Sequence, residues 1–101
     1  MDPFEIEARR RAGELLALRP EGEREYVYPA WQFDRDWRVR PELVPALARA
    51  RERGVDGRRL ADLLARRVAM TDRRRLVDVL LAGDTHTVLA AIEAATAARR
   101  E

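Results

Sequence analysis

The residue types that carry out most enzyme chemistry are scarce in this sequence of 101 residues. Histidine occurs once, as His86, and both cysteine and serine are absent. No residue near His86 has the spacing of a metal ligand, and it has no serine or cysteine to activate. Asp84 lies two residues before it, at the expected start of a helix, so a surface or capping role is the favoured interpretation.

The carboxylates and glycines do not form a recognisable active site either. Glu5 and Glu7 each precede an arginine by four residues, a spacing typical of salt bridges on an exposed helix and not of an acid–base pair. The glycines at positions 54 and 57 lack the lysine and hydroxyl residue of a phosphate-binding loop, so they predict a turn. The sequence therefore predicts a binding protein that is not an enzyme and needs no metal or cofactor.

Aromatic residues are the most concentrated candidates for binding. Five of the six lie between Tyr26 and Trp37, which gives this segment the content of an interface anchor. Residues 25–33 alternate polar and apolar positions, and residues 15–18 offer a partner strand across a polar turn, so we expect a hairpin over residues 15–33. The alternative is an aromatic loop that plugs a helical core.

Arginines near this hairpin suggest a second kind of partner. A basic helix leading into a hairpin with arginines at its turn resembles a helix-and-wing DNA-binding layout. The candidate DNA contacts are Arg9, Arg10, Arg11, Arg19 and Arg24. Against this interpretation, no supporting helix precedes the basic helix, and Glu5, Glu7 and Glu14 on the same helix oppose phosphate.

Helical periodicity predicts the elements that position these residues. We expect helices over residues 3–14, from Pro41 to Gly54, after Asp56, from Thr71 or Asp72 to Gly83, and from Asp84 to the frayed end. The residues expected to face the core are Leu43, Val44, Leu47, Ala50, Leu60, Leu63, Leu64, Val68, Leu76, Val77, Leu80, Leu81, Val88, Leu89, Ile92 and Ala95. The predicted fold is mainly α, a small helical bundle with one N-terminal β-hairpin. We expect a single domain over residues 1–101, with the helix and hairpin in residues 1–37 and the bundle in residues 38–101.

Composition indicates the cellular location of this domain and the partners that suit its charge. The apolar fraction of 47% is ample for a core, and no apolar run reaches the roughly 20 residues that span a membrane. Without cysteine or a signal peptide, we expect a cytoplasmic protein with no membrane contact, and the use of arginine for all 20 basic residues suggests a GC-rich bacterial genome. Residues 41–75 hold ten arginines against five carboxylates, which predicts either a patch for phosphate or an acidic partner, or a solvated helix face.

Several segments together resemble bacterial antitoxins of the Xre/MbcA/ParS type. Residues 11–18 (RAGELLAL), 28–34 (YPAWQFD) and 39–43 (VRPEL) resemble the hairpin and entry helix of that family. Residues 75–84 (RLVDVLLAGD) and 88–91 (VLAA) are similar to its toxin-binding domain, in which a helix ends in a Gly-Asp turn before the last helix. The resemblance covers roughly residues 8–95, and the order and spacing of the segments carry it.

The resemblance implies a homodimer that binds a RES-domain toxin, an enzyme that consumes NAD, and blocks its pocket with C-terminal residues. The toxin-facing residues would be Gly83, Asp84, His86, Arg99 and Arg100. Many relatives also repress their own operon through an N-terminal DNA-binding segment, whose upstream helices this chain lacks. Residues 71–75 also replace the Gly-rich, Pro-containing approach to the fourth helix that is usual in the family.

Two hypotheses follow from these observations. The first is an antitoxin-like protein that neutralises a cognate RES-type toxin and regulates its own operon. The alternative is a small DNA-binding transcriptional regulator without a toxin partner. An alanine-rich segment, residues 90–98, permits close helix–helix approach and so favours self-association, although it also suits an isolated stable helix.

Overall fold

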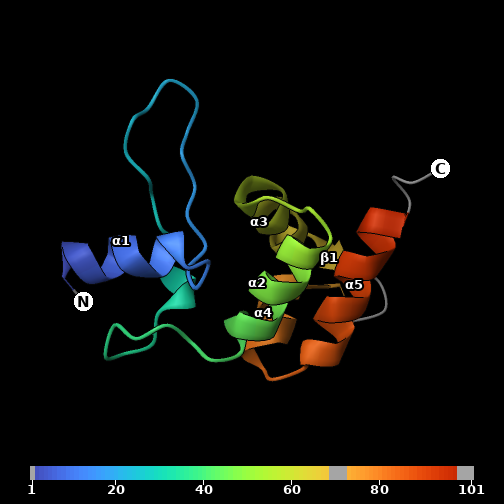
Figure 1. Cartoon of the computed structure of the whole chain (residues 1–101). Coiled ribbons are helices and arrows are strands. Elements are labelled where there is room, and N and C mark those ends of the chain that lie inside the picture. Colours follow the sequence, from blue (N-terminus) through green and yellow to red (C-terminus); the bar gives the residue numbers. More distant parts are fainter. Residues whose placement is uncertain (1, 69–72, 98–101) are drawn as a thin grey trace.

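Helices make up most of the computed structural model, which describes residues 2–68 and 73–97 (Figure 1). In chain order they are α1 (Pro3–Arg11), a one-turn 3-10 helix η1 (Ala30–Gln32), α2 (Leu43–Glu52), α3 (Gly57–Ala65), α4 (Leu76–Leu81) and α5 (Thr85–Ala97). Two short strands, β1 (Arg67–Val68) and β2 (Arg74–Arg75), pair antiparallel between α3 and α4. The expectation of a mainly α fold is confirmed. None of the helices within the described ranges combines the length and apolar character needed to cross a lipid bilayer.

The core lies among the four helices that follow Pro41. Helix α5 packs against α2 and α4, and α3 packs against α4, so each helix buries one apolar face. The largest fully buried side chains of these helices are Leu43, Leu60, Leu64, Leu76, Val79, Leu80, Val88 and Ile92. Figure 1 shows these helices on one side of the molecule, while α1 and the long loop that follows it lie on the other.

Local sequence signals explain where the bundle helices begin and end. The Asp56 carboxylate accepts the Arg59 N–H at 2.9 Å and caps α3, as expected. Asp84 accepts the Thr87 N–H at 3.2 Å and the Thr87 hydroxyl at 2.7 Å at the start of α5. Gly83 follows α4 with φ of +95°, a left-handed conformation that favours glycine.

Two predicted core faces differ from the observed ones. On α2, the buried face consists of Leu43, Ala46 and Ala50, which share one side of the helix at spacings of three and four residues. Val44 lies off this face and is 55% exposed. On α4, Val79 is fully buried and Leu81 only partly buried. This six-residue helix is covered by both α3 and α5, so four of its residues face protein.

The fourth helix also begins later than predicted. It starts at Leu76, because Arg74 and Arg75 are extended and pair with β1. No side chain caps its first turn. The predicted caps, Thr71 and Asp72, lie outside the described residues.

The predicted N-terminal hairpin is absent as a pair of strands within the described residues. It is reduced to one bridge, in which Leu18 and Val27 exchange backbone hydrogen bonds of 2.9 and 2.6 Å. Pro29 has no N–H for a strand ladder, and the chain turns there into η1. Helix α1 ends at Arg11, before the expected position 14, and Gly13 follows with φ of +75°.

The buried side-chain amide of Gln32 joins η1 to the stretch of chain that follows α1. Gln32 is 0% exposed; its Oε1 accepts the Leu16 N–H at 2.8 Å, and its Nε2 donates to the Leu16 carbonyl at 2.9 Å. The side chain thus replaces the two backbone hydrogen bonds that a neighbouring strand would supply. Leu16 itself belongs to the bundle core, and Trp31 packs against that core. The alternative of an aromatic loop that plugs the core therefore holds for Trp31 but not for the whole segment.

Candidate protein-binding surface

An apolar hollow of about 410 Å³ opens on the N-terminal side of the molecule. We call it the aromatic hollow, and its lining consists of Ile6, Tyr26, Val27, Tyr28, Phe33 and Trp37. Five of these residues belong to the segment that the sequence singled out, and four of the five are aromatic. Ile6 comes from α1 and Val27 from the bridge, so three separate stretches of chain contribute to the hollow.

The exposure of the lining distinguishes this surface from the bundle. Trp37 is 63% exposed and Val27 is 50% exposed, and on α1 Phe4 is 85% exposed. Among the described residues, Val44 on α2 is the one strongly exposed large hydrophobic residue of the bundle. Soluble proteins rarely leave contiguous large apolar side chains in water without a use for them, so the aromatic hollow is the leading candidate for an interaction surface.

A rigid turn places Trp37 over the hollow. The Asp34 carboxylate accepts the N–H groups of Asp36 at 2.8 Å and Arg38 at 2.9 Å. The hydrogen bond from Arg38 holds the pKa of Asp34 below its usual value, against a smaller opposing effect of desolvation. Trp37 adopts φ of +60°, and its ring centroid lies 6.0 Å from that of Phe33. A bulky residue in the left-handed region carries strain, which the Asp34 turn offsets.

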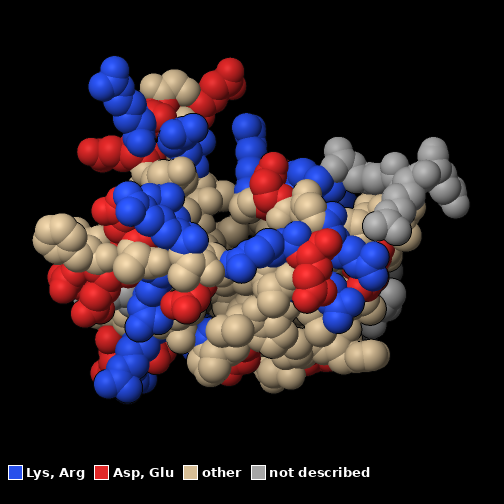
Figure 2. All heavy atoms as spheres, viewed as in Figure 1, with Lys and Arg blue, Asp and Glu red and all other residues tan. Residues whose placement is uncertain are grey.

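Charged residues of both signs border the hollow. Glu5, Arg9, Asp36 and Arg38 line an adjoining depression that also includes Trp37. Figure 2 shows acidic and basic side chains mixed with uncharged residues on the α1 side of the molecule. An apolar centre with a polar rim is the usual arrangement of a protein–protein interface.

The structure brings together two of the five candidate DNA-binding arginines. The guanidinium of Arg10 lies 4.2 Å from the ring centroid of Tyr26, and that of Arg19 lies 5.7 Å from it. Arg24 is exposed in the loop between the two bridge residues. Arg10 and Arg19 therefore meet at the Tyr26 ring.

Glutamates balance the arginines of α1. Arg9 pairs with Glu14 at 3.6 Å, and Arg11 pairs with Glu7 at 2.7 Å. Arg10 lies 3.8 Å from the same Glu7 carboxylate. These carboxylates reduce the attraction of α1 for phosphate, as the sequence indicated.

Five of the ten arginines in residues 41–75 lie in or beside the small β-ribbon that β1 and β2 form. The exposed arginines of this ribbon are Arg66, Arg67, Arg73, Arg74 and Arg75. Arg67 lies directly opposite Arg75, a like-charge pairing that costs stability. Asp78 accepts two hydrogen bonds from Arg75, at 3.0 and 3.2 Å, and these raise the pKa of Arg75.

The candidate toxin-binding residues occupy one exposed turn between α4 and α5. Gly83, Asp84 and His86 are all exposed there, away from the aromatic hollow. The hydroxyl and N–H of Thr87 hold the pKa of Asp84 below its usual value, with smaller effects from His86 and Arg74. Capping thus accounts for Asp84, which the sequence placed at the start of this helix. Arg99 and Arg100 lie outside the described residues.

Two features of this region escaped the sequence interpretation. The participation of Ile6 in the hollow depends on how α1 packs, and the role of Gln32 depends on a contact sixteen residues away in the chain. Within the described residues, no group of histidine and carboxylate side chains could hold a metal ion.

Comparisons with known proteins found no match: no family model, no curated protein and no solved structure matches this chain.

Proposed function

We propose that this protein acts by binding another protein, and that its partner is a toxin which it neutralises by direct contact. The aromatic hollow is the observation that supports binding most strongly, because it combines exposed aromatic side chains, a charged rim and a turn that holds Trp37 in place. The identification of the partner as a RES-type toxin rests on the resemblance of residues 8–95 to Xre/MbcA/ParS antitoxins.

The exposed rings offer enough surface to anchor a partner. A tryptophan side chain buries about 150–250 Å² when it is fully covered, and burial contributes about 25 cal/mol for each Å² of apolar surface. Covering Trp37 is therefore worth a few kcal/mol, which is the scale of an interface hot spot. Because the Asp34 turn already fixes its backbone, Trp37 loses less conformational freedom on binding than a flexible residue does.

The proposal places a second toxin contact at the C-terminal side of the molecule. There, Gly83 and Asp84 before α5 and His86 in its first turn are exposed, and they present a carboxylate and an imidazole, which the lining of the aromatic hollow lacks. Arg99 and Arg100 extend this contact in the antitoxin interpretation. Two contacts on different sides suit a protein that wraps its partner or acts as a homodimer.

Co-expression tests this proposal directly. The tagged chain and the product of the adjacent gene are produced together, and co-purification and cell growth are both scored. We expect a stable complex and rescue of growth. A chain that purifies alone and gives no protection contradicts the proposal. A variant that lacks residues 98–101 tests the C-terminal contact separately. We expect this variant to give no protection while it retains its far-UV circular dichroism spectrum.

The second candidate is a DNA-binding regulator, and the arginine-rich ribbon is the observation that favours it. Exposed arginines on both strands of the ribbon suit contact with a phosphate backbone, although Arg75 also pairs with Asp78, as the arginines of α1 pair with glutamates. Such binding weakens with salt by a slope of about −0.9 per phosphate contact. Promoter binding that shows this slope and is reduced by replacing Arg9, Arg10 and Arg11 supports the original helix-and-wing interpretation. If this triple change has no effect, the ribbon becomes the site to test.

A further inference from the structure

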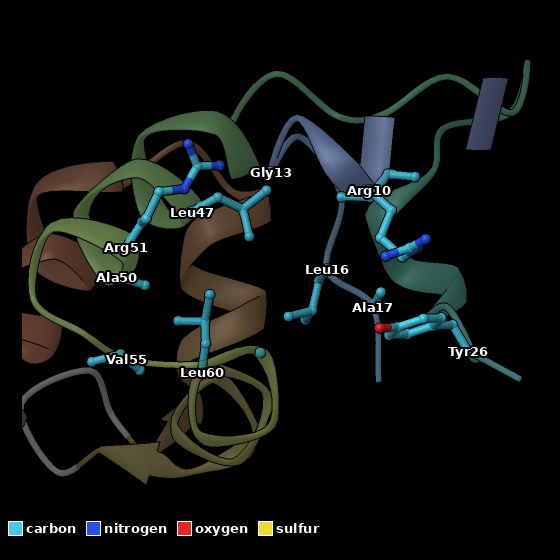
Figure 3. A pocket seen from close by; sticks show the side chains of 12 residues that line it. Arg10, Gly13, Leu16, Ala17, Tyr26, Leu47, Ala50, Arg51, Val55 and Leu60 are labelled. Atoms are coloured by element: carbon cyan, nitrogen blue, oxygen red, sulfur yellow. The ribbon is translucent and has the colours of Figure 1, made fainter. Parts of the chain in front are cut away.

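A second cavity, of about 260 Å³, lies where the N-terminal region meets the bundle (Figure 3). Side chains from α2, α3 and the stretch after α1 converge on it, and it is separate from the aromatic hollow except for the shared ring of Tyr26. Neither proposed function uses this cavity. Its volume is below the 300–1,000 Å³ typical of sites for drug-sized molecules, so any ligand must be small.

The floor of the cavity is apolar and well ordered by packing. Leu16 and Leu60 are almost completely buried, and Val55 is buried beside them. Figure 3 shows Leu16 and Leu60 approaching each other from opposite sides, with Leu47 above them. A compact apolar group, such as a single ring or a branched alkyl chain, matches this floor.

The rim carries two arginines that come from different elements. Arg10 of α1 is steadied by its contact with Tyr26, 4.2 Å from the ring centroid. Arg51 of α2 donates to the Ala12 carbonyl at 3.1 Å and lies across Gly13. A Cβ atom at position 13 would be 1.2 Å from the Arg51 Nη2, so glycine at this position is what permits the Arg51 guanidinium to lie there.

The charges around the cavity are unbalanced. Of the described residues that line it, none is acidic, and Arg10 and Arg51 are the charged ones. The Glu7 carboxylate lies 3.8 Å from Arg10, beyond hydrogen-bond length, and is outside the lining. A guanidinium has five N–H donors, so Arg10 and Arg51 retain donors beyond the contacts described.

We propose that this cavity binds a small carboxylate that has a compact apolar body. The carboxylate lies at the end of the rim that carries Arg51, and the apolar body lies on the floor of Leu16, Leu47 and Leu60, while Arg10 lies at the opposite end beside Tyr26 (Figure 3). Arginine and carboxylate form charge-assisted hydrogen bonds that a neutral analogue cannot match. Either a free carboxylic acid or the C-terminal carboxylate of a peptide supplies this chemistry.

An NMR titration of the full chain tests the proposal with benzoate and, as a neutral molecule of similar size, benzyl alcohol. We expect benzoate to shift the backbone amide signals of Leu16, Val55 and Leu60 in a saturable way. Benzyl alcohol should bind at least tenfold more weakly. Equal binding of the two probes, shifts confined to other regions, or no saturable shift overturns the proposal.

Substitutions assign the effect to the rim. Arg51→Gln should weaken benzoate binding about tenfold, and Gly13→Ala should do the same because it displaces the Arg51 guanidinium. Arg10→Gln, at the opposite end of the cavity, should have a smaller effect. Arg58→Gln removes an exposed charge on α3 that is outside the lining, and it should leave the affinity unchanged. An equal loss in the Arg58 variant contradicts a specific site. If a rim variant fails to fold, the comparison of benzoate with benzyl alcohol on the unaltered chain still decides the matter.

Two further probes distinguish the sources of the carboxylate. One is a short peptide that ends in valine with a free carboxylate, and the other is the same peptide with a C-terminal amide. Tighter binding of the free-acid peptide than of benzoate identifies a chain terminus as the ligand. Binding of benzoate alone identifies a free small acid.

Discussion

The N-terminal region and the helical bundle are held in place by different kinds of contact. In the bundle, α2, α3, α4 and α5 each bury leucine, valine, isoleucine or alanine side chains in a common core. Helix α1 has no buried residue, and large apolar side chains around it remain exposed. The N-terminal region is attached to the bundle through Leu16 and Trp31, which pack in or against its core, and through the hydrogen bond from Arg51 to the Ala12 carbonyl, while the Gln32 amide ties Leu16 to η1.

In the proposed function, this difference gives the two regions different roles. The bundle buries most of its apolar side chains, so in the proposed function it supports the aromatic hollow and offers a partner mainly the polar contact at Gly83, Asp84 and His86. The N-terminal region keeps the rings of Phe4, Tyr26 and Trp37 exposed, which suits them to recognition. Breaking each set of contacts separately tests whether the two regions respond differently.

The largest effect is expected from a cavity in the bundle. Leu80 is completely buried at the centre of α4, and Leu80→Ala should lower the free energy of unfolding by about 3–4 kcal/mol, as buried leucine truncations usually do. The milder Ile92→Val change should cost only about 1 kcal/mol. Urea unfolding followed by circular dichroism measures both variants. A loss below 1 kcal/mol for Leu80→Ala contradicts its place in the core.

A smaller and more local effect is expected from Gln32. Replacing it with methionine keeps the volume but leaves the buried N–H and carbonyl of Leu16 without partners, at a cost of about 2 kcal/mol. Amide hydrogen exchange should accelerate in residues 14–40 and stay slow in α4 and α5. Uniform acceleration along the whole chain contradicts the separation of the two regions, because it means that both open together.

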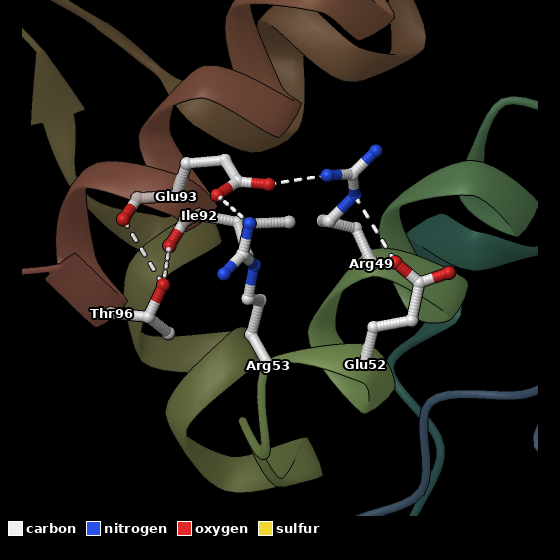
Figure 4. Close-up of polar contacts among 6 residues, drawn as sticks. All are labelled: Arg49, Glu52, Arg53, Ile92, Glu93 and Thr96. Carbon is white, nitrogen blue, oxygen red and sulfur yellow. Dashed lines mark hydrogen bonds and ion pairs between the residues drawn. The ribbon is translucent and has the colours of Figure 1, made fainter.

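The smallest effect concerns a charge cluster that joins α2 to α5 (Figure 4). Glu93 on α5 accepts hydrogen bonds from Arg49 on α2 and from Arg53, which directly follows α2. Desolvation alone would raise the pKa of Glu93, but the hydrogen bonds and charges of the two arginines lower it below 4.5. The contacts of ionised Glu93 with the two arginines therefore stabilise the fold above pH 4.5, and this contribution is lost as the pH falls through the lowered pKa of Glu93.

Glu93→Gln should consequently reduce the urea midpoint at pH 7, and the difference from the unaltered chain should shrink when both are measured well below pH 4.5. Glu52→Gln provides the control, because Glu52 makes only a 3.6 Å contact with Arg49 and its side chain is mostly exposed. A difference for Glu93→Gln that persists unchanged in acid contradicts the assigned role of the charge.

The bundle was largely predictable from the sequence, because local signals and the final packing agree there. Helical periodicity located α2, α3 and α5, and Asp56 and Asp84 marked helix starts. Val44 was assigned to the wrong face, since periodicity alone does not decide which neighbouring stripe meets α5. The start of α4 was missed because Arg74 and Arg75 pair with β1, a contact that helical periodicity does not reveal.

The N-terminal region was less predictable, because contacts between separate stretches of the chain determine its structure. Alternating residues suggested a strand, but tertiary contacts of Gln32 and the turn at Pro29 produced η1. The concentration of aromatic residues correctly marked the segment that lines the hollow. The contacts of Arg10 with Tyr26 and of Arg51 with Ala12 depend on how distant stretches pack, and neither has a local sequence signal.

The most direct test of the account compares two exposed apolar residues, one from each region. Once a complex with the toxin has been isolated, its affinity is measured by isothermal titration calorimetry for Trp37→Ala and Val44→Ala. Both side chains are more than half exposed, so neither change should disturb the fold. We predict that Trp37→Ala weakens binding by about 30-fold or more, equivalent to about 2 kcal/mol, and that Val44→Ala leaves it unchanged. Equal affinities for the two variants, or a loss only with Val44→Ala, would contradict the assignment of the binding surface to the N-terminal region.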